Sequence, residues 1–217
     1  MSERFNSIKA HIRDINLDMI TGTHQIKLDV SKRYNTRFRF RMPNKELINY
    51  VIKMGGVLTG SRAMKCYSVN NKPMLDRKSF DWDFIITTEM AFKICDKFDI
   101  TELYSVGDTI TIKRHRWYVH PAYSESYRIG PVDVHLIIND KLPEFIEQKG
   151  IRVASFNYAI NEKIKLINSL LTNPPIMSNT GYSYISRNVS KEESDKHLDD
   201  LTQLIIKFNC IDGKENI

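Results

Sequence analysis

Three aspartates stand where acidic residues are unusual, at the beginning of apolar strands or inside them. Asp81 and Asp83 flank Trp82 in one apolar run, and Asp133 interrupts a second one. Residues two apart on a strand point to the same face, so Asp81 and Asp83 are expected side by side. Neighbouring carboxylates repel each other unless a divalent cation neutralises both. The three acids therefore predict a magnesium site. The alternative is that Asp81 is a strand-entry or turn residue and that Asp133 pairs with a neighbouring arginine.

A glycine turn upstream of the acids could bind phosphate. The short apolar run 57–59 leads into Gly60-Ser61-Arg62, where a helix is expected to begin. Glycine lets a backbone approach a ligand closely, and a serine hydroxyl and the first amides of a helix can donate hydrogen bonds to phosphate. Arg62 would add a fixed positive charge. A strand, a glycine turn and a helix followed by an Asp-x-Asp pair predict a phosphate site beside a metal site.

These segments resemble the nucleotidyltransferase superfamily of the polymerase beta type, in particular its small members. The resemblance rests on Leu58–Ala63, Asp81–Ile86 and Val132–Val134, and it covers about residues 44–140. It implies transfer of a nucleoside monophosphate from a nucleoside triphosphate, such as ATP, to an acceptor hydroxyl, with release of pyrophosphate. It implies two Mg²⁺ ions as cofactors, with Mn²⁺ as a substitute. One departure is the spacing, because Asp81 follows Ser61 by 20 positions, more than in most small members.

The same resemblance implies a role for each site residue. Asp81 and Asp83 would bind both metal ions, and Asp133 would complete the metal site and help to activate the acceptor hydroxyl. The residues expected to hold the nucleotide are Gly60, Ser61, Arg62 and Lys163. For Lys163 the alternative is a solvated helix face. His135 is assigned no role.

Basic residues outside these motifs could bind a polyanionic acceptor, which we expect to be RNA, such as tRNA, or DNA. Lys72, Arg77 and Lys78 lie in a polar, basic stretch at 65–79 that is predicted to be a loop. Arg114 and Arg116 alternate with aromatic residues on a predicted strand, a mixture that suits phosphate contacts and base stacking. The alternatives are a solvated loop and an edge strand protected by charge.

The elements that would position these residues alternate between strands and helices. The pattern predicts a hairpin at 24–42, a helix from Asn44 to Gly55-Gly56, a strand at 81–87 and a helix after Thr88. Strands are expected at 101–106, 109–120 and 132–138, a short helix at 142–149, and only helices from 154 onward. The predicted fold class is α/β (α+β), a polymerase-beta-like mixed sheet flanked by helices with a C-terminal helical extension. Residues 1–153 would form the catalytic domain and residues 154–217 the helical region packed on it.

The composition argues against a disulfide-rich protein and against a membrane-spanning one. The chain has 217 residues, a net charge of +6, and three scattered cysteines, too few for a disulfide framework. No apolar run approaches the roughly 20 residues that span a bilayer, so we expect a cytoplasmic protein without a membrane partner, in the host cytoplasm if the chain is viral. The main prediction is an active nucleotidyltransferase. The alternatives are a non-catalytic nucleic-acid-binding or regulatory module on the same scaffold, and a toxin-type enzyme that modifies protein. The oligomeric state is left open.

Overall fold

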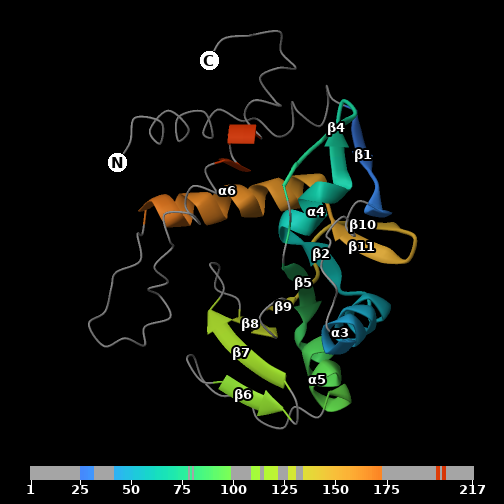
Figure 1. Cartoon of the computed structure of the whole chain (residues 1–217), viewed down its shortest axis with the longest axis vertical. Helices are drawn as coiled ribbons and strands as arrows, with labels where there is room; N and C mark the ends of the chain where they lie inside the picture. The colour runs from blue at the N-terminus through green and yellow to red at the C-terminus, as the bar shows by residue number, and fades with distance from the viewer. Residues whose placement is uncertain are drawn as a thin grey trace.

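The computed structural model describes residues 25–31, 42–77, 79, 81–98, 109–112, 115–121, 127–130, 134–172, 199–200 and 202–203. These residues form a mixed α+β structure, in agreement with the predicted fold class at that level. Its largest element is an eight-stranded sheet with the strand order β10-β11-β2-β5-β9-β8-β7-β6 (Figure 1). The sheet is mixed, because β11 pairs with β2 and β5 pairs with β9 in parallel while the other neighbours are antiparallel.

Three strands occupy the middle of this sheet, namely β2 (Val57–Thr59), β5 (Trp82–Thr87) and β9 (Val134–Asn139). On one side of them lie β11 (Ile151–Ala154) and β10 (Phe145–Gln148). On the other side lie β8 (Tyr127–Gly130), β7 (His115–Pro121) and β6 (Thr109–Ile112). A second, three-stranded sheet has the order β1-β3-β4 and consists of β1 (Ile26–Leu28), β3 (Tyr67–Val69) and β4 (Lys72–Pro73).

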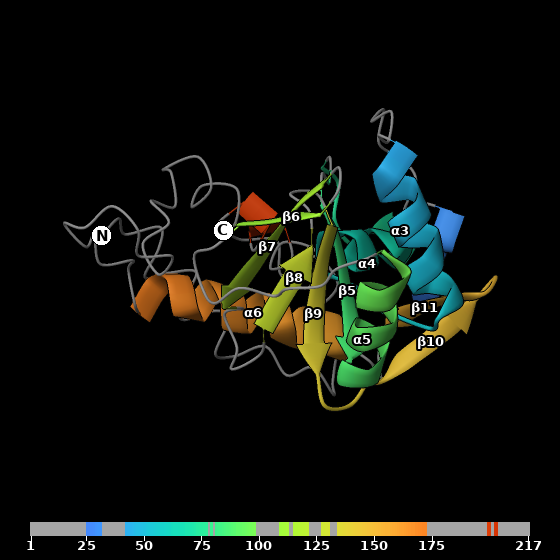
Figure 2. The same ribbon diagram turned by 90° about the horizontal axis from the view of Figure 1, so that it is seen from below.

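Four helices lie within the described residues, namely α3 (Met42–Lys53), α4 (Gly60–Cys66), α5 (Thr88–Lys97) and α6 (Phe156–Thr172). In Figures 1 and 2, α3 and α5 lie together at the end of the central strands where β5 ends. Figure 1 shows α4 and α6 at the opposite end, where β5 begins. Asp81 and Asp83, two of the acids predicted to bind metal, lie at this second end.

Alternation along β5 divides the apolar core between the two faces of the sheet. Trp82, Phe84 and Ile86 belong to the larger core, whereas Ile85 belongs to a smaller cluster with Val57 and Ala154. Burying these side chains stabilises the sheet by roughly 1.5–3 kcal/mol for each large apolar residue. Because side chains alternate, Asp83 shares the face of Ile85, where the core is smaller.

The polar stretch at 65–79 was predicted to be a loop, and this prediction is wrong. The segment contains the end of α4 and the β3–β4 hairpin, and Tyr67, Val69 and Met74 in it are buried. Asn70 and Asn71 form the hairpin turn with φ of 48° and 64°, a left-handed conformation that asparagine tolerates better than most residues. Strands of two and three residues are too short for their alternation to stand out among polar neighbours.

The helix predicted at 142–149 is also wrong. Phe145–Gln148 form β10, which pairs antiparallel with β11 through a turn at Lys149 and Gly150, whose φ angles are 52° and 70°. A lysine-glycine turn between two short apolar stretches is a hairpin signal. The first stretch is also consistent with a helical period, so the apolar pattern alone does not distinguish a helix from a strand there.

Other boundaries shift without changing the element type. The first predicted strand exists as β1, but it pairs with β3, and residues 32–41 of the predicted hairpin lie outside the described residues. Helix α3 begins at Met42, two residues before the predicted cap, and Gly55 follows it with a φ of 87°. The N-cap of α5 is Thr87, whose hydroxyl accepts a hydrogen bond from the Met90 amide at 3.3 Å. The predicted strand at 109–120 is two strands, β6 and β7.

Candidate active site

Strand direction brings three separated segments to one edge of the sheet. Because β2 and β5 are antiparallel, the end of β2 lies beside the beginning of β5, and Thr59 pairs with Asp83. Because β5 and β9 are parallel, their beginnings lie side by side, and Asp83 pairs with His135. The glycine turn, one acid of the Asp-x-Asp pair and the beginning of β9 therefore meet at this edge.

The backbone of Gly60 packs against the side chain of Asp83. Its φ is +64°, in the left-handed region that favours glycine. A Cβ atom added to Gly60 would lie 2.3 Å from Oδ2 of Asp83 and 3.2 Å from its Cβ atom. No real side chain tolerates such contacts, so the turn requires glycine for two independent reasons. The absence of a side chain at Gly60 allows the turn to pack directly against the Asp83 carboxylate.

The second oxygen of Asp83 contacts His135, for which no role is predicted from the sequence. Asp83 Oδ1 lies 2.8 Å from Nδ1 of His135, and the ring nitrogen must be the donor if the carboxylate is ionised. The two side chains are 24% and 13% exposed. The signal that could have found His135 is its position two residues after Asp133, since alternate residues of a strand share a face.

Of the other two predicted acids, the structure describes Asp81 but not Asp133. Asp81 is partly buried, and its backbone carbonyl accepts a hydrogen bond from Arg62 Nε at 2.7 Å. Asp133 lies outside the described residues, although the next residue, Val134, pairs with Trp82. Among the residues with described side chains, no group of three or more His, Cys, Asp or Glu residues is placed to hold a metal ion. The convergence of the three acids therefore stays a prediction.

Arg62, which was predicted to hold the nucleotide, lies in the core. Its side chain is 1% exposed, Nη2 donates to the Ser79 carbonyl at 3.1 Å, and the guanidinium carbon lies 4.3 Å from the centre of the Trp82 ring. A guanidinium engaged in this way holds the backbone of residues 79–81 in place before β5 begins. Arg62 therefore positions Asp81, whereas direct contact with a nucleotide was predicted.

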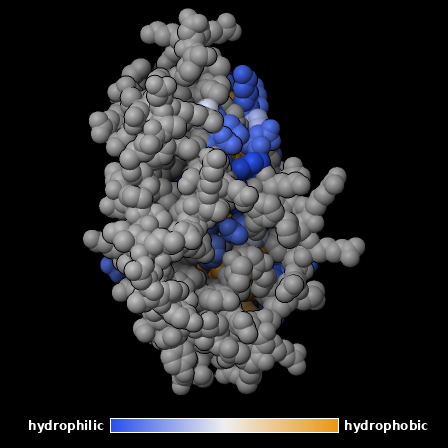
Figure 3. Space-filling view, turned by 60° about the vertical axis from the view of Figure 1, so that its left-hand side comes forward, coloured by the Kyte–Doolittle hydropathy of each residue, from blue (hydrophilic) through white to orange (hydrophobic). Residues whose placement is uncertain are grey.

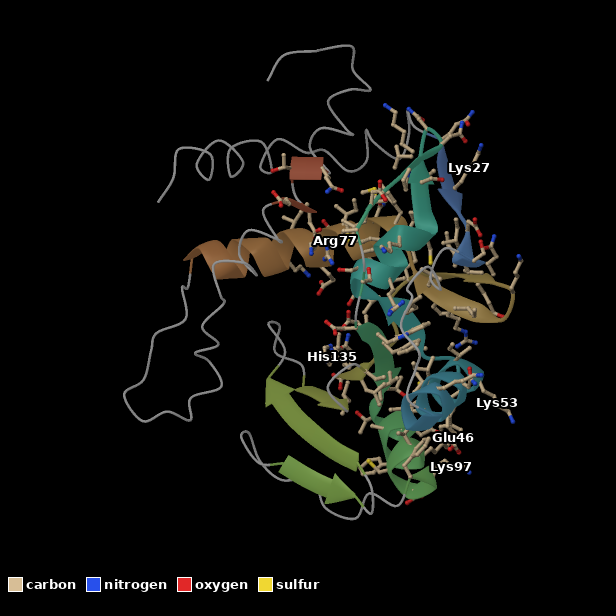
Figure 4. All side chains as sticks on the ribbon, viewed as in Figure 1. Lys27, Glu46, Lys53, Arg77, Lys97 and His135 are labelled. Atoms are coloured by element: carbon tan, nitrogen blue, oxygen red, sulfur yellow. The ribbon has the colours of Figure 1, made fainter. Side chains whose placement is uncertain are left out.

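A different arginine supplies the cation beside the turn. Arg77 Nη2 donates to Ser61 Oγ at 2.9 Å. The same guanidinium is paired with both carboxylate oxygens of Asp200, through Nη2 at 2.7 Å and through Nε. Lys163 Nζ, on α6, lies 2.6 Å from Oδ2 of Asp200. Figure 4 shows Arg77 beside α4 and α6.

This network brings together two residues for which different roles were predicted. Lys163 was expected to bind the nucleotide and Arg77 to bind an acceptor, but both contact the same carboxylate next to Ser61. Asp200 itself was not predicted as a site residue. It lies 123 residues after Arg77 in the chain, and nothing local marks it.

The Asp200 carboxylate is fully buried and remains ionised. Burial by itself would raise its pKa, but the hydrogen bonds and charges of Arg77 and Lys163 outweigh burial and hold the pKa below its ordinary value. A carboxyl group with a lowered pKa in the folded state stabilises the fold fully above its unfolded-state pKa. This stabilisation is lost as the pH falls through the folded-state pKa.

We expect this contribution to appear in the pH dependence of unfolding. The difference in the free energy of unfolding between the wild type and Asp200→Asn should be constant above about pH 5 and shrink below about pH 4. Urea titrations between pH 3 and pH 7 measure it. Asp199→Asn, a change of the exposed neighbour, serves as the control. A difference that stays constant down to pH 3 would contradict the ionised network.

The predicted acceptor-binding residues that the structure describes lie on separate segments of the chain. Lys72 is exposed on β4, and Arg116 lies on β7. Lys78 and Arg114 lie outside the described residues. On the face drawn in Figure 3, the described residues that reach the surface are mainly hydrophilic. Of the predicted group, Arg77 belongs to the site itself.

In the described part of the chain, no helix is both long enough and apolar enough to cross a bilayer. No protein-family model, no curated protein and no solved structure matches this chain. The function of the site is therefore inferred from the residues that it contains.

Proposed function

We propose that this chain is a Mg²⁺-dependent nucleotidyltransferase with a polymerase-beta-like core. It would move a nucleoside monophosphate from a nucleoside triphosphate to an acceptor hydroxyl and release pyrophosphate. The observation that supports the proposal most strongly is the packing of Gly60 against the Asp83 carboxylate. This contact joins the two motifs of the sequence resemblance, a phosphate-binding turn and an acidic pair, at one sheet edge.

The chemistry of the acids fits a magnesium site. Carboxylate oxygens are the hard ligands that Mg²⁺ prefers, and the Asp83 side chain is partly exposed at the beginning of β5. The residues that would hold the metal are Asp81, Asp83 and, by resemblance, Asp133. Bound there, two Mg²⁺ ions, or Mn²⁺ in their place, would neutralise phosphate charge and favour attack by the acceptor hydroxyl.

The remaining residues would bind and orient the reactants. Ser61 Oγ accepts a hydrogen bond from Arg77 Nη2 at 2.9 Å and could donate its own hydroxyl proton to a terminal phosphate. The Arg77 guanidinium would add positive charge beside that phosphate. His135 holds one carboxylate oxygen of Asp83 and thereby fixes the orientation of that side chain. Arg62 holds the backbone at Asp81 from within the core. The acceptor oxygen would attack the α-phosphorus as the bond to pyrophosphate breaks, and the hydroxyl proton would pass to a carboxylate, for which Asp133 is the candidate.

A labelling experiment tests the proposal and identifies the acceptor. The purified protein is incubated with Mg²⁺, each of the four ribonucleoside triphosphates carrying label on the α-phosphate, and separate pools of RNA, DNA and protein. We expect label in the RNA pool together with released pyrophosphate, and no label with Asp83→Asn.

The other outcomes separate the alternatives. Label in the protein pool would identify an enzyme of the toxin type, with an intact site and a different acceptor. Binding of RNA or DNA without any incorporation, for all four nucleotides and with either Mg²⁺ or Mn²⁺, would contradict catalysis and favour a nucleic-acid-binding or regulatory module.

A further inference from the structure

A buried carboxylate connects the C-terminal part of the chain to the glycine turn. Asp200 is 0% exposed and contacts cations from two other segments, Arg77 before β5 and Lys163 on α6. A buried charge is costly unless it is paired and hydrogen-bonded, and here both carboxylate oxygens have cationic partners. Three segments far apart in the sequence are therefore joined at one point.

The contact with Asp200 fixes the orientation of the Arg77 guanidinium relative to the glycine turn. A guanidinium is a flat fork of donors, and pairing with both oxygens of one carboxylate fixes its plane. With that plane fixed by Asp200, Nη2 of Arg77 also reaches Ser61 Oγ at 2.9 Å. Asp200 thus determines where Arg77 stands relative to the turn, although no contact between Asp200 and the turn is needed.

Positively charged side chains gather at this corner among the described residues. Arg77 and Lys163 both contact the carboxylate of Asp200. The pKa of nearby Lys65 is lowered, first by burial and then by the charges of Arg62 and Arg77, as expected where positive charge is in excess. Asp76 opposes this effect at Lys65. A site that keeps a positive charge next to a serine hydroxyl suits a phosphate group.

We propose that Asp200 is a positioning residue of the phosphate-binding turn, which fixes Arg77 against Ser61 and Lys163 beside it for the terminal phosphates of a nucleoside triphosphate. The C-terminal segment then completes the nucleotide site. This inference rests on the proposed function for the identity of its ligand, but the positioning of Arg77 can be tested without any ligand.

Binding of inorganic tripolyphosphate, measured by titration calorimetry at fixed salt concentration, tests the inference on the full-length chain. Asp200→Asn should weaken binding by about 10- to 100-fold, which corresponds to one lost hydrogen bond to a charged group. Arg77→Lys keeps the charge but loses the fork, so it should weaken binding similarly. The two changes combined should cost little more than either alone, because they break the same connection. Asp199→Asn, at the exposed neighbouring position, should stay within about twofold of the wild type.

Unchanged or tighter binding by folded Asp200→Asn would overturn the inference, because Asp200 would then compete with phosphate for the two cations. If Asp200→Asn does not fold, Arg77→Lys decides, and unchanged binding by that variant overturns the inference. Hydrogen exchange of the turn amides at 60–63 in the ligand-free protein separates this inference from the proposed function. Faster exchange in Asp200→Asn than in Asp199→Asn supports positioning even if the wild type binds no tripolyphosphate, and equal exchange refutes it.

Discussion

Replacing Asp83 with asparagine is expected to abolish nucleotide transfer and to leave the fold intact. The substitution removes the negative charge from the carboxylate that faces both Gly60 and His135. Asparagine has the same shape and can still pair with the His135 ring, and the side chain is partly exposed, so the free energy of unfolding should change little. Losing a charged group that stabilises the transition state typically costs two to three orders of magnitude in rate, and loss of a metal ligand adds to this cost. We expect a decrease of about 1000-fold or more.

The matched control is Asp96→Asn. Asp96 is an exposed acid near the end of α5, away from the β2–β5 edge, and its replacement should leave transfer unchanged. Transfer is measured as release of pyrophosphate over a range of Mg²⁺ concentrations, and folding is checked by urea denaturation. Transfer by Asp83→Asn at the wild-type rate in saturating Mg²⁺ would remove Asp83 from the mechanism.

The elements that could be predicted from sequence are the long and strongly patterned ones. β5 and β9 are six-residue, largely apolar strands, and α6 repeats its apolar residues at helical spacing over 17 residues. β3, β4 and β10 have between two and four residues each, which is too few for a period to emerge. Their turns at Asn70-Asn71 and Lys149-Gly150 were the stronger signal.

The sequence predicts the motifs of the candidate site but not the side-chain contacts between residues that are far apart in the chain. Gly60, Ser61 and Asp83 were found because each belongs to a short local pattern. His135 and Asp200 were missed because their partners lie 52 and 123 residues away in the chain. Proximity in sequence was misleading for Arg62, which is next to Ser61 but turns into the core. Arg77, 16 residues further on, supplies the cation at Ser61.

Replacing Gly60 with alanine is expected to reduce both stability and transfer. The left-handed φ of +64° costs an alanine about 1–2 kcal/mol. The new Cβ would also clash with Asp83 Oδ2 at 2.3 Å and crowd its Cβ atom at 3.2 Å, so rotation of the carboxylate cannot relieve the contact fully. Overpacking of this kind adds about 1–3 kcal/mol. Because the relaxation must displace Asp83 or the turn itself, transfer should fall by at least about tenfold even where the variant is fully folded.

Gly150 offers a control with the same backbone conformation and no clash. Its φ is +70°, and a Cβ atom there would meet nothing within 4 Å. Gly150→Ala should therefore lose only the free energy of unfolding that the left-handed backbone conformation costs an alanine, about 1–2 kcal/mol. It should keep full transfer activity. Urea denaturation of both variants gives the two losses in the free energy of unfolding, and their difference measures the close approach at Gly60. Combining Gly60→Ala with Asp83→Ala removes the carboxylate from the clash, so the double variant should lose less stability than the sum of the two single ones. Equal losses for Gly60→Ala and Gly150→Ala, together with additive effects in the double variant, would mean that the turn does not pack against Asp83.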